Sequence, residues 1–145
     1  MKKVNKLDTN LEKDIVRIVE EGNELDELSK HLEAINLYKE AWSKLPPPAS
    51  QWEISSWIAG CLFSSFFDLK EHKQAKYWGN IELESRASDI DTGPLIVLGM
   101  VCYELEENYE AMRYFSKAYE LGRRRAFQEH PKKYYEFFIA EKDKS

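Results

Sequence analysis

The hydrophobic positions along this chain recur with the spacing of amphipathic helices. Apolar side chains three or four residues apart form one stripe over residues 11–25 and a second over residues 32–45. Two further runs with this spacing cover about residues 51–68 and 72–86. No segment shows sustained alternation of apolar and polar residues, and the chain has no Asn-Gly or Asp-Gly turn, so β-hairpins are not expected. The pattern predicts an all-α fold.

Stop and start signals divide these stripes into separate helices. Three consecutive prolines at residues 46–48 end the second helix, because a proline ring has no amide donor and clashes with the preceding helical turn. Pro94 suits the first turn of a fifth helix over about residues 94–105. A sixth helix is expected over residues 109–121, with Gly122 as its C-terminal stop.

Small and aromatic residues repeat along the chain at fixed offsets. Two segments share a glycine that is followed by an alanine, an aromatic residue and an alanine at offsets of 12, 16 and 19: Gly22, Ala34, Tyr38 and Ala41, and then Gly99, Ala111, Phe115 and Ala118. We expect each glycine to let the second helix of a pair approach the first, against the first alanine. The aromatic residue is expected to fill the gap between one pair and the next.

The middle segment departs from this pattern. Ala75 keeps the place of the first alanine, but Phe63 stands at the place of the glycine and Gly79 at the place of the aromatic residue. Glu82 replaces the second alanine. We expect Trp78 to supply the missing bulk from the neighbouring position.

This spacing resembles the tetratricopeptide repeat (TPR), in which small and aromatic residues alternate between two antiparallel helices and a proline closes the unit. The resemblance implies a TPR-like α-solenoid of about three helix-turn-helix repeats, with a C-terminal capping helix, in a single domain over residues 1–145. The repeats are expected at about residues 9–46, 51–87 and 92–122, and the capping helix at about 131–142. A generic helical bundle is the alternative fold.

Composition and charge limit the classes of function. The chain has 26 acidic and 21 basic residues, a net charge of −5, which argues against a general nucleic-acid binder. No apolar segment is long enough to span a bilayer, and the charged N-terminus is unlike a secretory signal, so we expect no membrane partner. Cys61 and Cys102 both lie in apolar surroundings and are interpreted as reduced core thiols. A cytoplasmic protein accounts best for these features.

Candidate catalytic and metal-ligating residues are few. His31, His72 and His130 form no His-x-x-x-His pair and are interpreted as exposed histidines at helix starts or in loops. The two cysteines lie 41 residues apart, which does not favour a zinc site, and the common glycine-rich phosphate motifs do not occur. The sequence predicts no enzyme, no cofactor, no metal and no small-molecule substrate.

Charge is distributed unevenly along the chain. Residues 20–40 carry a net charge of −5, and residues 82–110 carry −7. The segment 123–145, in contrast, carries +3. The two acidic segments lie near equivalent turns of the first and third repeats. We therefore expect electrostatic steering of a basic protein partner toward them.

The TPR resemblance also implies which residues form the concave, partner-binding face. Carried over position by position, and extended with two acidic neighbours, the predicted set is Asn23, Asp26, Glu27, Trp57, Phe67, Met100, Tyr103, Glu104, Glu106 and Glu107. Aromatic and methionine side chains in this set are the predicted anchors. The face has almost no Lys or Arg, which disfavours binding to an acidic C-terminal tail.

Size, acidity and the missing catalytic motifs make the chain similar to small stand-alone bacterial TPR proteins, some of which are immunity proteins of polymorphic or contact-dependent toxins. The resemblance implies an interaction module that neutralises a cognate toxin, possibly a basic nuclease, by covering its active site. The alternative is a chaperone or scaffold adaptor that holds a helix or extended segment of a partner. Gene context discriminates the two.

Overall fold

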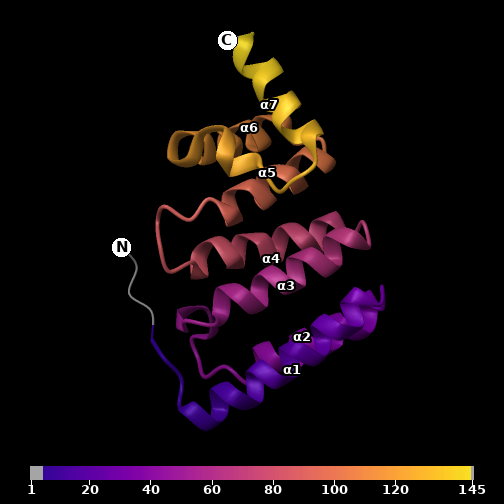
Figure 1. Cartoon of the computed structure of the whole chain (residues 1–145), viewed down its shortest axis with the longest axis vertical. Coiled ribbons are helices and arrows are strands. Elements are labelled where there is room, and N and C mark those ends of the chain that lie inside the picture. Colours follow the sequence, from indigo (N-terminus) through magenta and orange to yellow (C-terminus); the bar gives the residue numbers. More distant parts are fainter. Residues whose placement is uncertain (1–4, 145) are drawn as a thin grey trace. The chain divides into compact units, whose positions relative to one another are not determined.

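The computed structural model describes residues 5–144, and it is helical throughout (Figure 1). Within these residues there is no strand, and the backbones of Asn5 and Trp52 form an isolated parallel bridge. The predicted all-α fold class is confirmed. The chain divides into two compact units, residues 1–89 and 90–145, which are described separately below.

The first unit contains two helical hairpins. α1 (Thr9–Glu27) pairs with α2 (His31–Ser43), and α3 (Ser55–Asp68) pairs with α4 (His72–Ser85). The hairpins stack through α2 and α3 (Figure 1). Fully buried apolar side chains form the core of this unit, among them Ile15, Ile58 and Leu62.

The second unit contains one hairpin and a closing segment. α5 (Gly93–Glu104) pairs with α6 (Asn108–Gly122), which is followed by the short 3-10 helix η2 (Arg123–Phe127) and by α7 (Lys132–Asp143). The buried ring of Phe115 lies within 6.4 Å, centroid to centroid, of four aromatic rings from η2 and α7, those of Phe127, Tyr134, Phe137 and Phe138. These rings hold the C-terminal segment against the hairpin.

The third helix begins later than the apolar spacing indicates. It was expected from about residue 51, but α3 begins at Ser55, after the 3-10 helix η1 (Ala49–Gln51). The indole Nε1 of Trp52 donates to the carbonyl of Pro46 at 2.7 Å, and the hydroxyl of Ser55 accepts from the backbone N–H of Trp52 at 3.1 Å. These bonds hold residues 46–54 as a connector, so Trp52 belongs to the loop and not to the helix.

All three hairpins use the same turn. Leu28, Leu69 and Leu105 end the first helices, and the residues that follow, Ser29, Lys70 and Glu106, have φ angles of 61°, 61° and 63°. In each turn the next backbone N–H reaches a carbonyl five residues earlier, at 2.8–3.0 Å, as in a Schellman motif. Equivalent residues of the three hairpins can therefore be assigned from the turns alone, without the side-chain repeat.

Replacing Lys70 by glycine is expected to raise the free energy of unfolding by about 0.5–1 kcal/mol. A left-handed conformation costs an L-residue about 1–2 kcal/mol, and part of this gain is lost to the greater freedom of glycine in the unfolded chain. Urea denaturation measures the change. Lys70→Ala is the matched control, because it removes the same side chain but keeps the strained φ; an equal gain in that variant would contradict a backbone origin.

The repeated glycines accommodate aromatic rings. A Cβ atom on Gly22 would lie 2.6 Å from the ring of Tyr38, and one on Gly99 would lie 2.3 Å from the ring of Phe115. This corrects the expected partner of each glycine, since the nearest side chain is the aromatic residue of the opposite helix and not the first alanine. The alanines Ala34 and Ala111 are fully buried nevertheless.

The middle hairpin reverses this arrangement. By the alignment of the turns, Phe63 on α3 occupies the position of Gly22, and Gly79 on α4 occupies that of Tyr38. Both Phe63 and Gly79 are buried. By position, the large and the small residue have thus exchanged helices, and the ring of Phe63 stacks on that of Phe67, with a centroid distance of 5.4 Å. Trp78, expected to supply bulk here, is also buried, and its ring lies 5.3 Å from that of Trp42 on the first hairpin.

Candidate functional site

A cavity of about 340 Å³ opens between the two hairpins of the first unit. It is lined by residues from all four helices: Asn23, Asp26, Tyr38, Ser56, Trp57, Gly60, Cys61, Ser64 and Glu82. Two of these residues are acidic, and none of the nine carries a positive charge. Three residues of the predicted partner-binding set, Asn23, Asp26 and Trp57, are brought together here.

One wall of the cavity is organised by the amide of Asn23. Because Gly22 has no side chain, the ring of Tyr38 packs directly on α1, and its hydroxyl donates to Oδ1 of Asn23 at 2.6 Å. The thiol of Cys61 lies 3.7 Å from the same oxygen. Burial raises the pKa of the Tyr38 hydroxyl well above its usual range, so it remains a hydrogen-bond donor at all physiological pH values.

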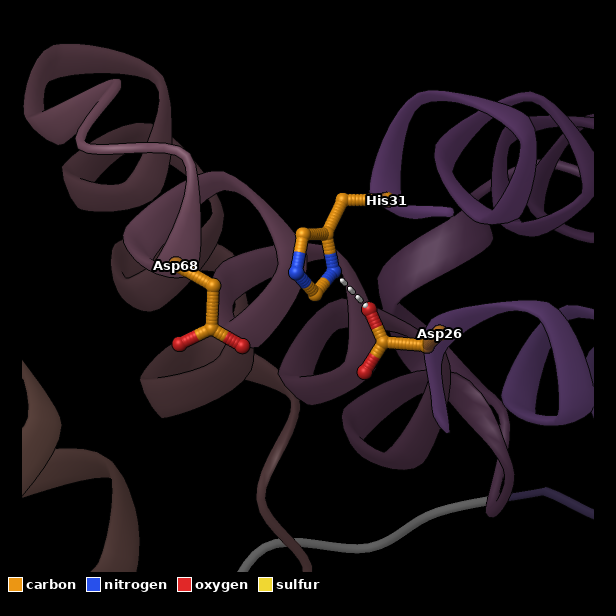
Figure 2. Close-up of side chains that lie close together, drawn as sticks. All are labelled: Asp26, His31 and Asp68. Atoms are coloured by element: carbon orange, nitrogen blue, oxygen red, sulfur yellow. Dashed lines mark hydrogen bonds and ion pairs between the residues drawn. The ribbon is translucent and has the colours of Figure 1, made fainter. Parts of the chain in front are cut away.

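The carboxylate of Asp26 organises the other wall. Its Oδ1 accepts from the hydroxyl of the fully buried Ser65 at 2.7 Å and lies 2.6 Å from Nδ1 of His31 (Figure 2). The prediction of an exposed histidine is wrong for His31, whose side chain is only 18% exposed. The turn after α1 places this histidine at the start of α2, directly beside Asp26.

A second carboxylate completes a cluster around this histidine. The imidazole of His31 lies between Asp26 and Asp68, and its nitrogen that does not contact Asp26 is on the side of Asp68 (Figure 2). One donor atom from each of the three residues lies within 4.8 Å of the others. The pKa of Asp68 is raised, first by burial and then by the charge of Asp26, while His31 opposes the shift. These residues could hold a metal ion.

The thiol of Cys61 near this cluster is not arranged for covalent catalysis. The hydroxyl of Ser65 and the thiol of Cys61 are directed at oxygens of Asp26 and Asn23, and neither contacts the imidazole. Burial, followed by the charges of Asp26 and Glu82, raises the pKa of the Cys61 thiol to about 12. A nucleophile needs a base within hydrogen-bond reach or a lowered pKa, and Cys61 has neither.

Other predicted residues of the first unit lie outside the cavity. Glu27 is exposed at the end of α1. Phe67 is half-buried, and its ring lies 5.4 Å from the rings of both Phe63 and His72. Trp57, which does line the cavity, is 41% exposed and offers the largest accessible apolar surface in its wall.

In the second unit, the predicted anchors Met100 and Tyr103 pack against neighbouring residues. Met100 is only 6% exposed. The ring of Tyr103 packs edge-on against Tyr134 and Phe137 of α7, with centroid distances of 5.5 and 4.9 Å. α7 therefore packs on the ring of Tyr103, which is half-buried, and Met100 offers little accessible surface.

The carboxylate of Glu104 is also engaged by α7. Its Oε2 accepts from the hydroxyl of Tyr134 at 2.6 Å and pairs with the ammonium of Lys133 at 2.8 Å. Glu106 and Glu107 lie in the turn between α5 and α6, Glu106 exposed and Glu107 half-buried. The charge of Glu104 is thus neutralised within the second unit by Lys133.

Sequence reasoning did not find Cys61, Glu82 or His31 as members of the site. Asp26 and His31 are separated by one Schellman turn, a five-residue spacing that could have indicated their proximity. Asp68 lies on another hairpin, 37 residues beyond His31, and no local pattern connects the two.

Comparison with known proteins identifies no matching family model and no matching curated protein. The class that the fold itself defines is that of stacked helical hairpins, and the resemblance to TPR proteins stays a prediction. Among the helices of residues 5–144, none has the length and apolar character that a bilayer crossing requires.

Proposed function

We propose that this protein is a protein–protein interaction module of the TPR-like class, which takes a cationic side chain of a basic partner into the cavity of its first unit. The observation that carries the proposal is the cavity wall, which combines two carboxylates, no Lys or Arg, and an exposed indole.

The charge of the wall supports a cationic guest. Asp26 is part-buried, and a carboxylate in such surroundings interacts more strongly with a cation than one in open solvent. An arginine or lysine of a partner gains charge-assisted hydrogen bonds there, together with acceptors from Asn23 and Ser64. The cavity volume of about 340 Å³ lies at the low end of small-molecule sites, and it suits a single side chain.

Trp57 supports the same guest. An indole face is the best aromatic surface for a cation within about 6 Å of the ring centroid. Tryptophan and arginine are also the residue types that dominate binding energy at protein interfaces. The exposed part of Trp57 borders the acidic wall, so one arginine side chain can use both.

A displayed library of random peptides tests this function. We expect selection on the immobilised protein to enrich peptides with an arginine or lysine, and Trp57→Ala to shorten the lifetime of their complexes by about tenfold or more. The double variant Asp26→Asn, Glu82→Gln is expected to abolish the enrichment. Acidic or purely apolar selected peptides would contradict the proposal.

A matched variant separates the effect of the cavity carboxylates from the effect of the net charge of the protein. Glu33→Gln, Glu40→Gln changes the net charge by the same amount on exposed positions of α2 that do not line the cavity. We expect this control to slow association slightly and to leave complex lifetimes unchanged, because exposed charges act mainly on the association rate. An equal loss of complex lifetime in both double variants would indicate a diffuse electrostatic attraction and no specific pocket.

The biological role that we propose is immunity in the cytoplasm against a basic toxin domain, such as a nuclease. The supporting observations are the small size, the net charge of −5 and the acidic cavity, since steering toward an acidic inhibitor speeds capture of a basic partner. An affinity pull-down from native cells, read by mass spectrometry, tests the role. A basic toxin encoded beside this gene supports it, whereas a secretion or assembly component favours the adaptor.

A further inference from the structure

The cluster of Asp26, His31 and Asp68 shares Asp26 with the cavity, but the proposed partner binding does not use His31 or Asp68. We infer that these three residues form a binding site for a divalent transition-metal ion of the Zn²⁺ class. The inference does not depend on the proposed function, because it rests on donor type, donor spacing and the bonds that orient the donors.

The donor types select the metal. Imidazole nitrogen suits zinc, copper, iron and nickel, whereas Mg²⁺ and Ca²⁺ take oxygen ligands. One nitrogen and two carboxylates form a mixed set that zinc accepts with water in the remaining position. The three donor atoms lie within 4.8 Å of one another, and zinc bonds of about 2.1 Å require about 3.4 Å between donors in a tetrahedron. The side chain of Asp68 is exposed, so it can turn to bring its carboxylate oxygen closer to the other two donors.

Two of the three donors already face each other. Nδ1 of His31 lies 2.6 Å from Oδ1 of Asp26 (Figure 2), and a bound ion takes the place of the proton between these two atoms, which then separate to about 3.4 Å. Carboxylates that bind a metal are in turn hydrogen-bonded by neighbouring groups. Here the buried hydroxyl of Ser65 donates to Oδ1 of Asp26 at 2.7 Å. The cluster is therefore supported by a bond from α3, the helix that also carries Asp68.

The second hairpin contains an internal control for this site. His72 occupies the place of His31 in the next turn, but Phe67 stands at the position of Asp26 and packs against the ring of His72 at 5.4 Å. A histidine at this turn without a carboxylate partner thus exists in the same molecule, and it is not expected to bind the ion.

Titration of the protein with Zn²⁺ in a calorimeter tests the inference. Titration with Co²⁺ adds a visible absorption spectrum that reports the ligand field of the ion. We expect one ion per chain and a rise in melting temperature, because the ligands connect α1, α2 and α3. His31→Gln and Asp68→Asn are expected to weaken binding by at least about tenfold, and Ser65→Ala to weaken it by a similar factor through Asp26. His72→Gln is expected to bind as the unchanged protein does.

Three results would overturn the site. The first is no saturable binding of Zn²⁺ by the unchanged protein. The second is a loss of Zn²⁺ affinity in His72→Gln that equals the loss in His31→Gln. The third is Mg²⁺ binding as tight as that of Zn²⁺, since a nitrogen ligand would then be irrelevant. Asp68 is exposed, so Asp68→Asn is expected to fold, and circular dichroism of each variant verifies this before titration.

Discussion

Replacing Gly99 by alanine is expected to lower the free energy of unfolding by about 1–3 kcal/mol, although alanine is the better helix former. The new methyl group would lie 2.3 Å from a ring carbon of Phe115. This ring cannot retreat, because it is fully buried and surrounded by aromatic rings of η2 and α7, the nearest of them that of Phe127 at 5.4 Å. Urea denaturation followed by circular dichroism measures the loss.

Gly60→Ala is the matched control for this prediction. Gly60 also lies within a first helix, but its added methyl would meet the carboxylate of Glu82 at 3.3 Å, the movable end of a flexible side chain. We expect little change or a gain of up to about 1 kcal/mol from helix propensity. A loss at Gly60 as large as that at Gly99 would show that the ring contact is not the cause.

At pH 8 the thiol of Cys61 in the folded protein is expected to react with iodoacetamide roughly 1000-fold more slowly than in the unfolded chain, because only the thiolate attacks. Burial, Asp26 and Glu82 together raise its pKa from 9.0 to about 12. The raised pKa favours the neutral thiol, so the thiolate fraction at pH 8 falls by that factor. Peptide mass spectrometry over a time course distinguishes the two cysteines.

The variant Asp26→Asn tests the electrostatic part of this shift. Removing a negative charge beside Cys61 lowers the pKa of the thiol, so labelling is expected to accelerate. Cys102 is fully buried on α5 and is expected to stay slow in both proteins. Rapid labelling of Cys61 in the unchanged native protein would contradict the raised pKa and would reopen a redox role for this residue.

The helices were predictable from sequence because their signals are local. Apolar spacing and the three prolines act within a few residues of the helix ends that they determine, and six of the seven helices in residues 5–144 begin and end within two residues of the expected positions. The exception is the start of α3, where a tertiary bond from Trp52 to Pro46 overrides the apolar spacing. Gly122, the expected stop after the sixth helix, is instead the last residue of α6, and the positive φ of 55° belongs to Arg123.

The candidate site was predictable only in part. Asn23, Asp26 and Trp57 follow from the spacing of one helix face, and the cavity contains all three. Tyr103 and Glu104 were assigned to a binding surface because their spacing matched the repeat, but α7 contacts both of them. No periodicity within α5 can indicate that a helix 30 residues later covers it. The proximity of His31 and Asp68 was not predictable for the same reason, since Asp68 comes from another hairpin.

The exchange of Phe63 and Gly79 affects which helices can pair with each other during folding. If α1 paired with α4, Gly22 would meet Gly79 and leave a void, and if α3 paired with α2, Phe63 would meet Tyr38 and collide. Misassembly between similar units is a characteristic failure of repeat proteins. We therefore expect that a repeat of this chain can be duplicated or transplanted only when both of its helices move together.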